Sequence, residues 1–331
     1  MILDVPSWAA RPPLNKRTGL NNIKECLDAT LFNNDWFIRN RQGNTKYLNV
    51  LQGSDDLEAD VWYDAVKHLP FEGWAMGGNN MQDMKLFLRR MINLRDEKLL
   101  EKGERDLIHV LGTGLLEWSV MLTAVKRKLR ETVNSDLEIC FDCASPFLAT
   151  AYGQIYTQHV HTNDRFSYIM DKALDDKRLA GSDIPLPWSS PIAERLNMGD
   201  VCWYKPGMLN KLGKEGRTSW DSFSYFLMMA HNIYQHIESV QRANALTDAV
   251  VASTDVALSD WQKKLKSKSK IGEVNKWVPR NLVYFNELVE QVFSSERPMD
   301  VINDNSALLE ELSKNKRHTS TNTMHGAFFE T

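Results

Sequence analysis

Four short apolar runs constrain the fold of this chain most strongly. They span residues 47–51, 74–76, 107–111 and 137–141, and a glycine or a polar residue follows each of them. The stretches between the runs place apolar side chains at helical spacing, as Leu57, Val61 and Ala65 do after the first run. Alternation of strand-like and helix-like segments predicts parallel strands with helices packed outside them.

The start of the chain predicts a fifth strand. Met1-Ile2-Leu3-Asp4-Val5 has the form of a buried strand end that carries an acid, and residues 19–39 are predicted to form the helix after it. A closed (β/α) barrel has eight strands, so about five strands would form only part of one. We therefore expect an α/β fold of the TIM-barrel type, incomplete at its N-terminus, with a C-terminal helical extension.

The pattern changes after residue 158, and we predict three parts. Residues 1–158 are the partial barrel, with a hairpin around Gly153 near its end. Residues 159–260 are an irregular segment followed by helices that complete the core. Residues 261–331 are a basic segment and, from residue 312, a flexible tail.

A long helix is predicted over residues 223–244. Ser219 or Asp221 precedes it as a potential cap. Its apolar positions predict a core-facing side that comprises Phe226, Met229, Ile233, Ile237 and Val240.

The net charge of −3 excludes a general attraction to nucleic acid, so any such binding must use a local basic patch. Residues 263–270 are rich in lysine and lie between Trp261 and Trp277. This run is a candidate for contacts with a phosphate backbone. The alternative is a solvated helix face or loop.

The cysteines and the hydropathy bear on the compartment. Cys26, Cys140, Cys143 and Cys202 form neither a disulfide framework nor a paired zinc motif. Such cysteine usage fits a reducing cytoplasm, which would be the host cytoplasm if a phage encodes the chain. No apolar run approaches the roughly 20 residues of a membrane span, so we expect no membrane partner.

Asp142 is the strongest candidate for a chemical role. It stands at the end of the apolar run Leu137–Phe141, where a carboxylate is costly to desolvate unless it is paired or used. In a (β/α) barrel, catalytic groups lie at that end of the strands. The alternative is a turn former or helix cap.

Seven segments together resemble the queuine/preQ1 tRNA-guanine transglycosylase family over roughly residues 1–245, in order and in spacing. In chain order they are Leu3-Asp4, Gln52-Gly53, Met76-Gly77-Gly78, Leu111-Gly112-Thr113-Gly114, Phe141-Asp142-Cys143-Ala144-Ser145-Pro146, Gly153-Gln154-Ile155-Tyr156-Thr157 and Ala230-His231-Asn232. Members of this family are TIM barrels that exchange a guanine for a 7-deazaguanine. The places at which the chain departs from the tRNA enzymes resemble the branch of the family that puts 7-deazaguanines into DNA in phages and bacteria.

The resemblance implies a role for each matching residue. Asp142 would attack C1′ and hold the sugar as a covalent aspartyl-nucleoside. Asp4 would accept hydrogen bonds from the N1–H and 2-amino edge of guanine. The other base-binding residues it implies are Gln52, Gly53, Gly77, Gly78 and Gly112. The partners would be nucleic acid, either DNA or tRNA, and a 7-deazaguanine base.

The chain departs from the family at two places. The family's second catalytic aspartate lies upstream of the base-reading aspartate, so it and about three barrel strands are expected to be missing here. Asp83 is a candidate for a substitute acid/base. The family's structural zinc uses three cysteines and a histidine, whereas only Cys202 and His231 match, so no cofactor and no structural zinc are expected.

Other histidines and other functions stay open at this point. His109 lies inside a predicted strand and fits a core histidine, whereas His159 and His161 form an HxH pair with a weak potential for metal binding. The expected activity is that of a glycosyltransferase. The alternatives are a non-catalytic or split-gene subunit that binds nucleic acid, with a second chain or a homodimer completing the barrel, and an unrelated barrel enzyme.

Overall fold

The computed structural model describes residues 2–162, 165–172, 179, 181–201, 222–254, 278–314 and 320–322. The chain forms two compact units, which are described separately. Unit 1 comprises Met1–Thr113, Met121–Asp142 and Tyr284–Lys314. Unit 2 comprises Gly114–Val120, Cys143–Val283 and Asn315–Thr331.

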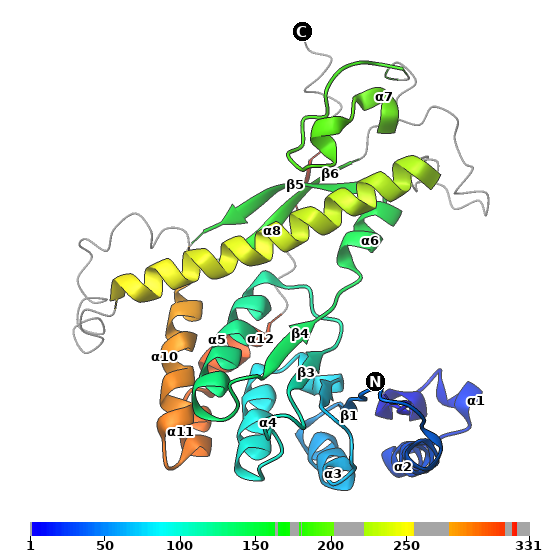
Figure 1. Ribbon diagram of the computed structural model, residues 1–331, viewed down its shortest axis with the longest axis vertical. Coiled ribbons are helices and arrows are strands. Elements are labelled where there is room, and N and C mark those ends of the chain that lie inside the picture. The colour runs from blue at the N-terminus through cyan, green and yellow to red at the C-terminus, as the bar shows by residue number, and fades with distance from the viewer. Residues whose placement is uncertain are drawn as a thin grey trace. The chain divides into compact units, whose positions relative to one another are not determined.

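Unit 1 is built on four parallel strands in the order β1-β2-β3-β4, as Figure 1 shows. These are β1 (Asn49–Leu51), β2 (Trp74–Met76), β3 (Leu107–Val110) and β4 (Glu138–Phe141). Helices α3 (Asp56–Val66), α4 (Met84–Asp96) and α5 (Leu116–Thr132) connect them in turn. The predicted alternation of strand and helix and the mixed α/β class are confirmed for this region.

The two faces of this sheet differ in what covers them. On one face, Asn49 is buried and its side-chain amide donates to the Val66 carbonyl of α3 at 2.7 Å. On the other face, Val50 and Ala75 pack against Ile2 and against side chains of α2 (Ile23–Asn40). The register continues this second face through His109 and Cys140, which face each other on β3 and β4.

The predicted fifth strand is wrong, because residues 2–6 belong to no strand. The Ile2 N–H donates to the Leu48 carbonyl at 3.2 Å, but the chain then turns away. The Val5 N–H donates to the hydroxyl of Thr30 on α2, and Pro6 has no N–H to give to a ladder. The segment therefore leads into η1 (Ser7–Ala10) and α1 (Asn15–Thr18).

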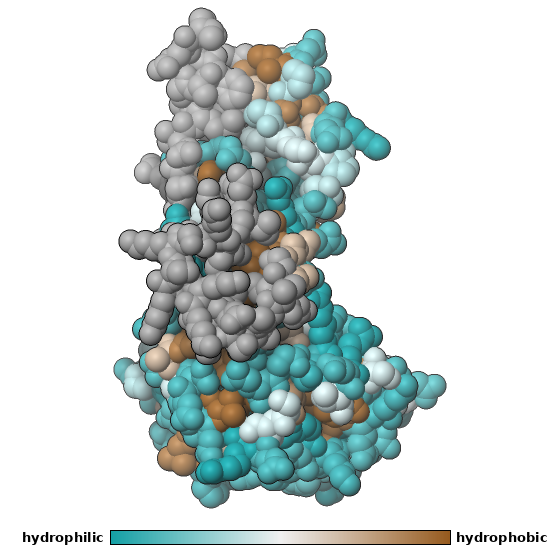
Figure 2. All heavy atoms as spheres, turned by 90° about the vertical axis from the view of Figure 1, so that its left-hand side faces the viewer, coloured by the Kyte–Doolittle hydropathy of each residue, from teal (hydrophilic) through white to brown (hydrophobic). Residues whose placement is uncertain are grey.

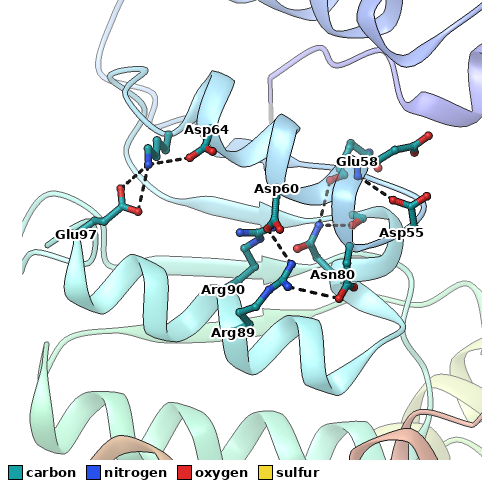
Figure 3. Close-up of polar contacts among 12 residues, drawn as sticks. Asp55, Glu58, Asp60, Asp64, Asn80, Arg89, Arg90 and Glu97 are labelled. Carbon is teal, nitrogen blue, oxygen red and sulfur yellow. Dashed lines mark hydrogen bonds and ion pairs between the residues drawn. The ribbon is translucent and has the colours of Figure 1, made fainter. Parts of the chain in front are cut away.

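A polar network joins α3 to α4, as Figure 3 shows. Arg90 is completely buried, and both Arg89 and Arg90 donate to Asp60 of α3. The Arg90 guanidinium also lies 4.7 Å from the centre of the Tyr63 ring. A buried cation needs such partners, because an unpaired charge in the interior is strongly unfavourable.

Three C-terminal helices return to unit 1 and pack near α4. They are α10 (Arg280–Ser294), α11 (Pro298–Asp304) and α12 (Ser306–Ser313). The Ser313 hydroxyl accepts from the first N–H of α4, that of Met84, at 2.8 Å. In Figure 2, hydrophilic residues cover most of the lower part of the picture, which holds unit 1, and apolar areas there are small and separate.

Unit 2 contains a helix where the sequence predicted a hairpin. Residues Ser145–Ala151 form α6, with Pro146 in its first turn, and Gly153 follows the helix end. The hairpin lies later, between antiparallel strands β5 (Gln154–His161) and β6 (Phe166–Lys172), so the start of the predicted irregular segment is also wrong. β7 (Ser320–Asn322), inside the predicted tail, pairs with β6. The short helices η4 (Ala193–Arg195) and α7 (Met198–Val201) complete the described elements of unit 2 that precede its long helix.

The long helix α8 (Ser222–Thr254) buries a different side from the one predicted. Phe226 and Ile237 are 66% and 50% exposed, so their assignment to the core is wrong. The buried side is largely polar and includes His231, Asn232, Gln235, His236 and Ser239. None of the helices in the described part of the chain is long and apolar enough to cross a membrane.

Candidate functional site

The predicted site residues lie in unit 1, at the carboxyl ends of its strands. Gln52, Gly77 and Asp142 directly follow β1, β2 and β4, and Gly112 is the second residue after β3. Because the strands are parallel, these positions lie together at the carboxyl end of the sheet. The structure sorts them into two groups, one at β1 and β2 and the other at β3 and β4.

The first group centres on Asp4 and Gln52. The Gln52 amide donates to Asp4 Oδ2 at 2.8 Å, although 48 residues separate the two in sequence. Gln52 is buried and Asp4 is half-buried. Burial raises the pKa of the Asp4 carboxyl, and the hydrogen bond from Gln52 opposes this rise. Asp4 therefore lies beside the end of β1, whereas the sequence predicted it at the end of a strand of its own.

The glycines of the first group make room for this pair. A Cβ on Gly77 would lie 2.8 Å from Gln52 Nε2, and one on Gly78 would lie 2.2 Å from the Gly53 carbonyl oxygen. Gly53 and Gly78 also adopt positive φ values of 130° and 55°. The Gly77 N–H donates to the Leu51 carbonyl, so that amide takes part in the sheet ladder. Close packing of backbone is the reason for glycine here.

The second group centres on Asp142 and His109. Asp142 Oδ1 lies 2.8 Å from His109 Nε2 and accepts from the Gly112 N–H at 3.2 Å. The Asp142 side chain is 60% exposed, whereas that of His109 is 19% exposed. Gly112 has a φ of 65°, which orients its N–H toward Asp142. Within the described residues, Asp142 Oδ2 accepts no hydrogen bond, so the contacts to this largely exposed carboxylate are made by Oδ1.

The sequence predicts a core histidine at position 109, and in the structure His109 contacts Cys140 as well as Asp142. Its Nδ1 lies 3.1 Å from Cys140 Sγ, the residue opposite it in the β3–β4 register. Cys140 is exposed in part, and partial burial, followed by the charges of Asp142 and Glu138, raises the pKa of its thiol. Cys140, His109 and Asp142 thus form one chain of polar contacts. The signal in the sequence was the i, i+2 spacing of Cys140 and Asp142 on one strand face.

Asp4 and Gln52 lie at the end of β1 and Asp142 lies at the end of β4, three strand spacings away. Neighbouring strands lie about 4.8 Å apart, so the ends of β1 and β4 are roughly 14 Å apart. This separation exceeds the width of one base. It suits a ligand that places a base at one group and a sugar at the other.

The weak metal candidates do not form a site in the described residues. His231 is buried, with Nδ1 at 2.8 Å from the Ser190 hydroxyl and Nε2 at 2.8 Å from the Tyr156 carbonyl, so both nitrogens are engaged within the core. Cys202 lies outside the described residues. His159 and His161 share a strand face, but no group of three potential ligands occurs in the part of the chain that the structure describes.

Comparisons of the whole chain add no assignment. No protein-family model matches it, and no curated protein is similar to it in sequence. A carboxylate with one oxygen held and the other without a hydrogen-bond donor can act as a nucleophile, and an acid–amide pair can recognise the polar edge of a base.

Asp83, the candidate for a substitute acid/base, is the N-cap residue of α4. Its Oδ1 accepts from the Lys85 and Leu86 N–H groups at 2.8 and 3.3 Å, which caps the start of α4. An N-cap of this kind stabilises a helix by about 1 kcal/mol. Asp83 is therefore accounted for without a catalytic role.

Proposed function

We propose that this chain exchanges a guanine in nucleic acid for a 7-deazaguanine base, with Asp142 as the nucleophile. The observation that carries the proposal is the Asp142 carboxylate, which lies exposed at the end of β4, with Oδ1 held by His109 and the Gly112 N–H and with no described hydrogen bond to Oδ2. Such a carboxylate is held in one orientation and has a free lone pair for attack. The resemblance of the strand-end motifs to the transglycosylase family supports the same role.

The proposed reaction has two displacements at one carbon. Asp142 Oδ2 attacks C1′ of the target nucleoside, the bond from C1′ to the base nitrogen breaks, and its electron pair leaves with guanine, which takes up a proton from water. The incoming base then attacks C1′ through its ring nitrogen, gives its N–H proton to the hydroxide formed in the first step, and the bond from C1′ to Oδ2 breaks, which releases the carboxylate. His109 Nε2–H and the Gly112 N–H stabilise the charge that returns to Asp142 in this second step.

Recognition of the base falls to the first group. An ionised Asp4 accepts two hydrogen bonds from the N1–H and 2-amino group of guanine, and the Gln52 amide holds Asp4 in place. The 7-deazaguanines keep this edge, so one site accepts both the leaving and the incoming base. The glycines at positions 53, 77 and 78 have no Cβ, so the backbone packs closely against its neighbours at this site.

The proposal extends to the fold, in which the four-stranded sheet is part of a TIM barrel. In the described residues, β4 has a strand neighbour on one side only, and Cys140 on it is exposed. An open strand edge favours pairing with another strand. This observation favours the alternative function, a subunit that binds nucleic acid and needs a second chain, or a second copy, for exchange.

The test is base exchange by Asp142→Asn. Wild-type protein is incubated with a 7-deazaguanine and with tRNA or DNA that carries labelled guanine, and release of the label is followed. We expect Asp142→Asn to release less than a hundredth of the label and to form no covalent adduct, while Asp28→Asn on the exposed side of α2 behaves like wild type. Full exchange by Asp142→Asn refutes the assignment. Activity that appears only with an added partner chain supports the alternative.

A further inference from the structure

The part of the chain just after Asp4 is unusually basic. Residues 5–24 contain Arg11, Lys16, Arg17 and Lys24 and no acidic residue, in a chain whose net charge is −3. The basic run predicted at residues 263–270 lies outside the described residues, whereas this N-terminal segment is a local basic patch that the structure does describe.

Three contacts place this segment beside the first site group. Asp4 is bound by Gln52, the Ser7 hydroxyl lies 2.8 Å from the hydroxyl of Ser54, and Arg11 pairs with Glu58 in the first turn of α3. Ser54 and Glu58 both follow the carboxyl end of β1. Helix η1 therefore borders the end of the sheet at which Asp4 lies, and α1 packs against η1, where the Thr18 hydroxyl donates to the Ala9 carbonyl.

The side chains in this segment are available to a ligand. Trp8 is 53% exposed, and Lys16 and Arg17 are exposed and form no ion pair with any described residue. We call Trp8, Arg11, Lys16 and Arg17 the N-terminal basic surface. An exposed tryptophan among unpaired cations is typical of surfaces that bind unpaired nucleotides.

The carboxylates near this surface are already engaged. Glu58 accepts from the Ser54 N–H and from Arg11, and this environment lowers the pKa of its carboxyl. Asp55 caps α3, and Asp56 pairs with Arg89. Among the described residues, Lys16 and Arg17 are therefore charges of this region that have no counterion.

We propose that the N-terminal basic surface binds the nucleic-acid strand that flanks the exchanged base. Lys16, Arg17 and Arg11 contact phosphates, and the Trp8 ring stacks on an unpaired neighbouring base. A base that undergoes chemistry at C1′ must leave its stack, which exposes the faces of its neighbours. The inference rests on the proposed function for the identity of the target base, while binding itself can be measured without any exchange.

The experiment measures binding by fluorescence anisotropy over a series of salt concentrations. The probes are a labelled single-stranded DNA, the matching duplex and a tRNA transcript, without any free base. The variants are Lys16→Ala/Arg17→Ala, Trp8→Ala and Trp8→Phe. The matched control is Lys46→Ala/Lys102→Ala, which removes two exposed lysines that precede β1 and β3, at the opposite end of the same sheet.

Each phosphate contact contributes about 0.7 to 0.9 to the slope of log Kd against log salt. We expect Lys16→Ala/Arg17→Ala to lower this slope by about 1.5 and to weaken binding at least about 10-fold at low salt. Trp8→Ala should weaken binding about 5- to 100-fold with an unchanged slope, and Trp8→Phe should restore most of it. The control should match wild type.

Each outcome decides the question. If the double variant and the control have the same affinity and slope, or if wild type binds none of the probes, the inference is wrong. If the variants weaken binding as expected but wild type exchanges no base, the surface stands and the proposed function fails. Tighter binding to the tRNA or to the single-stranded DNA identifies the source of the strand.

Discussion

His109 Nε2 and Asp142 Oδ1 lie 2.8 Å apart, at the ends of two adjacent parallel strands. An ionised carboxylate only accepts hydrogen bonds, so the Nε2 atom must carry the proton and Nδ1 then faces the Cys140 thiol as an acceptor. The Asp142 carboxylate thus favours the Nε2–H tautomer of His109, the Cys140 thiol favours the same tautomer by donating to Nδ1, and His109 in turn donates to Asp142 Oδ1.

The first prediction concerns this positioning role. His109→Gln should lower kcat for base exchange by about 10- to 100-fold with little change in KM, because a misoriented nucleophile loses rate rather than binding. Cys140→Ser, which keeps a hydrogen-bond donor, should retain most of the rate, whereas Cys140→Ala should lose part of it. Nitrogen NMR of His109 gives a readout without exchange: the Nε2–H tautomer should dominate in wild type and less so in Cys140→Ala. Equal tautomer populations and rates in both would contradict the role.

The second prediction concerns the contact between Gly53 and Gly78. Gly78→Ala should destabilise the fold by about 2–4 kcal/mol, because its Cβ would lie 2.2 Å from the Gly53 carbonyl oxygen and its φ is positive. Gly43→Ala is the matched control, since Gly43 has a φ of 76° and open space around it, and should cost about 1 kcal/mol. Urea unfolding measures both. Equal losses would mean that backbone strain alone, and not the contact, makes glycine necessary at position 78.

The third prediction concerns Asp60, the anionic partner of buried Arg90. Asp60→Ala should lower the free energy of unfolding by about 2–3 kcal/mol, because Arg90 would keep its charge in the interior without a counterion. The control Asp64→Ala leaves Lys67 with its second partner Glu97 at the surface and should cost less than about 0.5 kcal/mol. Thermal unfolding of the two variants beside wild type tests the difference. Similar midpoints for both would refute it.

The fourth prediction concerns pH. Burial, and then Arg242 and His159, lower the pKa of His161 to about 4, while an unfolded histidine titrates near 6.5. The unfolded chain therefore binds more protons between these values, so this contribution to stability is complete above about pH 6.5 and is lost as pH falls toward 4. His161→Leu should reduce the loss between pH 7 and pH 4.5 by about 2 kcal/mol.

The same substitution should leave stability at pH 7 unchanged or improve it. His161 Nε2 is buried and has no hydrogen-bond partner among the described residues, and such an atom is costly. Urea unfolding of wild type and variant at the two pH values measures both effects. An identical loss of stability on acidification would show that other groups carry the pH dependence.

The local sequence determined the alternation of strands and helices in unit 1. Apolar runs such as Leu107–Val110 and the helical periodicity of segments such as Met84–Asp96 depend on side chains a few residues apart, and both elements form as predicted. The position of Asp142 at a strand end follows from the same short-range pattern. Ile2–Asp4 failed as a strand because the competing partner of Val5, Thr30, lies 25 residues away.

Tertiary structure alone decided which side of α8 is buried. Hydropathy favours burial of Phe226 and Ile237, yet polar groups that find partners on β5 and near α6 take that place. Asn232 shows why: its carbonyl accepts from the Tyr156 N–H and its amide donates to Thr150. A buried polar group is tolerated when each of its hydrogen bonds is made, and no short sequence window contains those partners.

The site itself divides in the same way. The sequence placed acids, an amide and glycines at strand ends, because that depends on local pattern. It could not pair Asp4 with Gln52 or His109 with Asp142, since 48 and 33 residues separate these partners. Strand register brings His109 opposite Cys140, and register is fixed by the packing of whole sheet faces rather than by any one strand. The sequence by itself determined which residues lie at the carboxyl end of the sheet, and only the tertiary structure decided which of them are in contact.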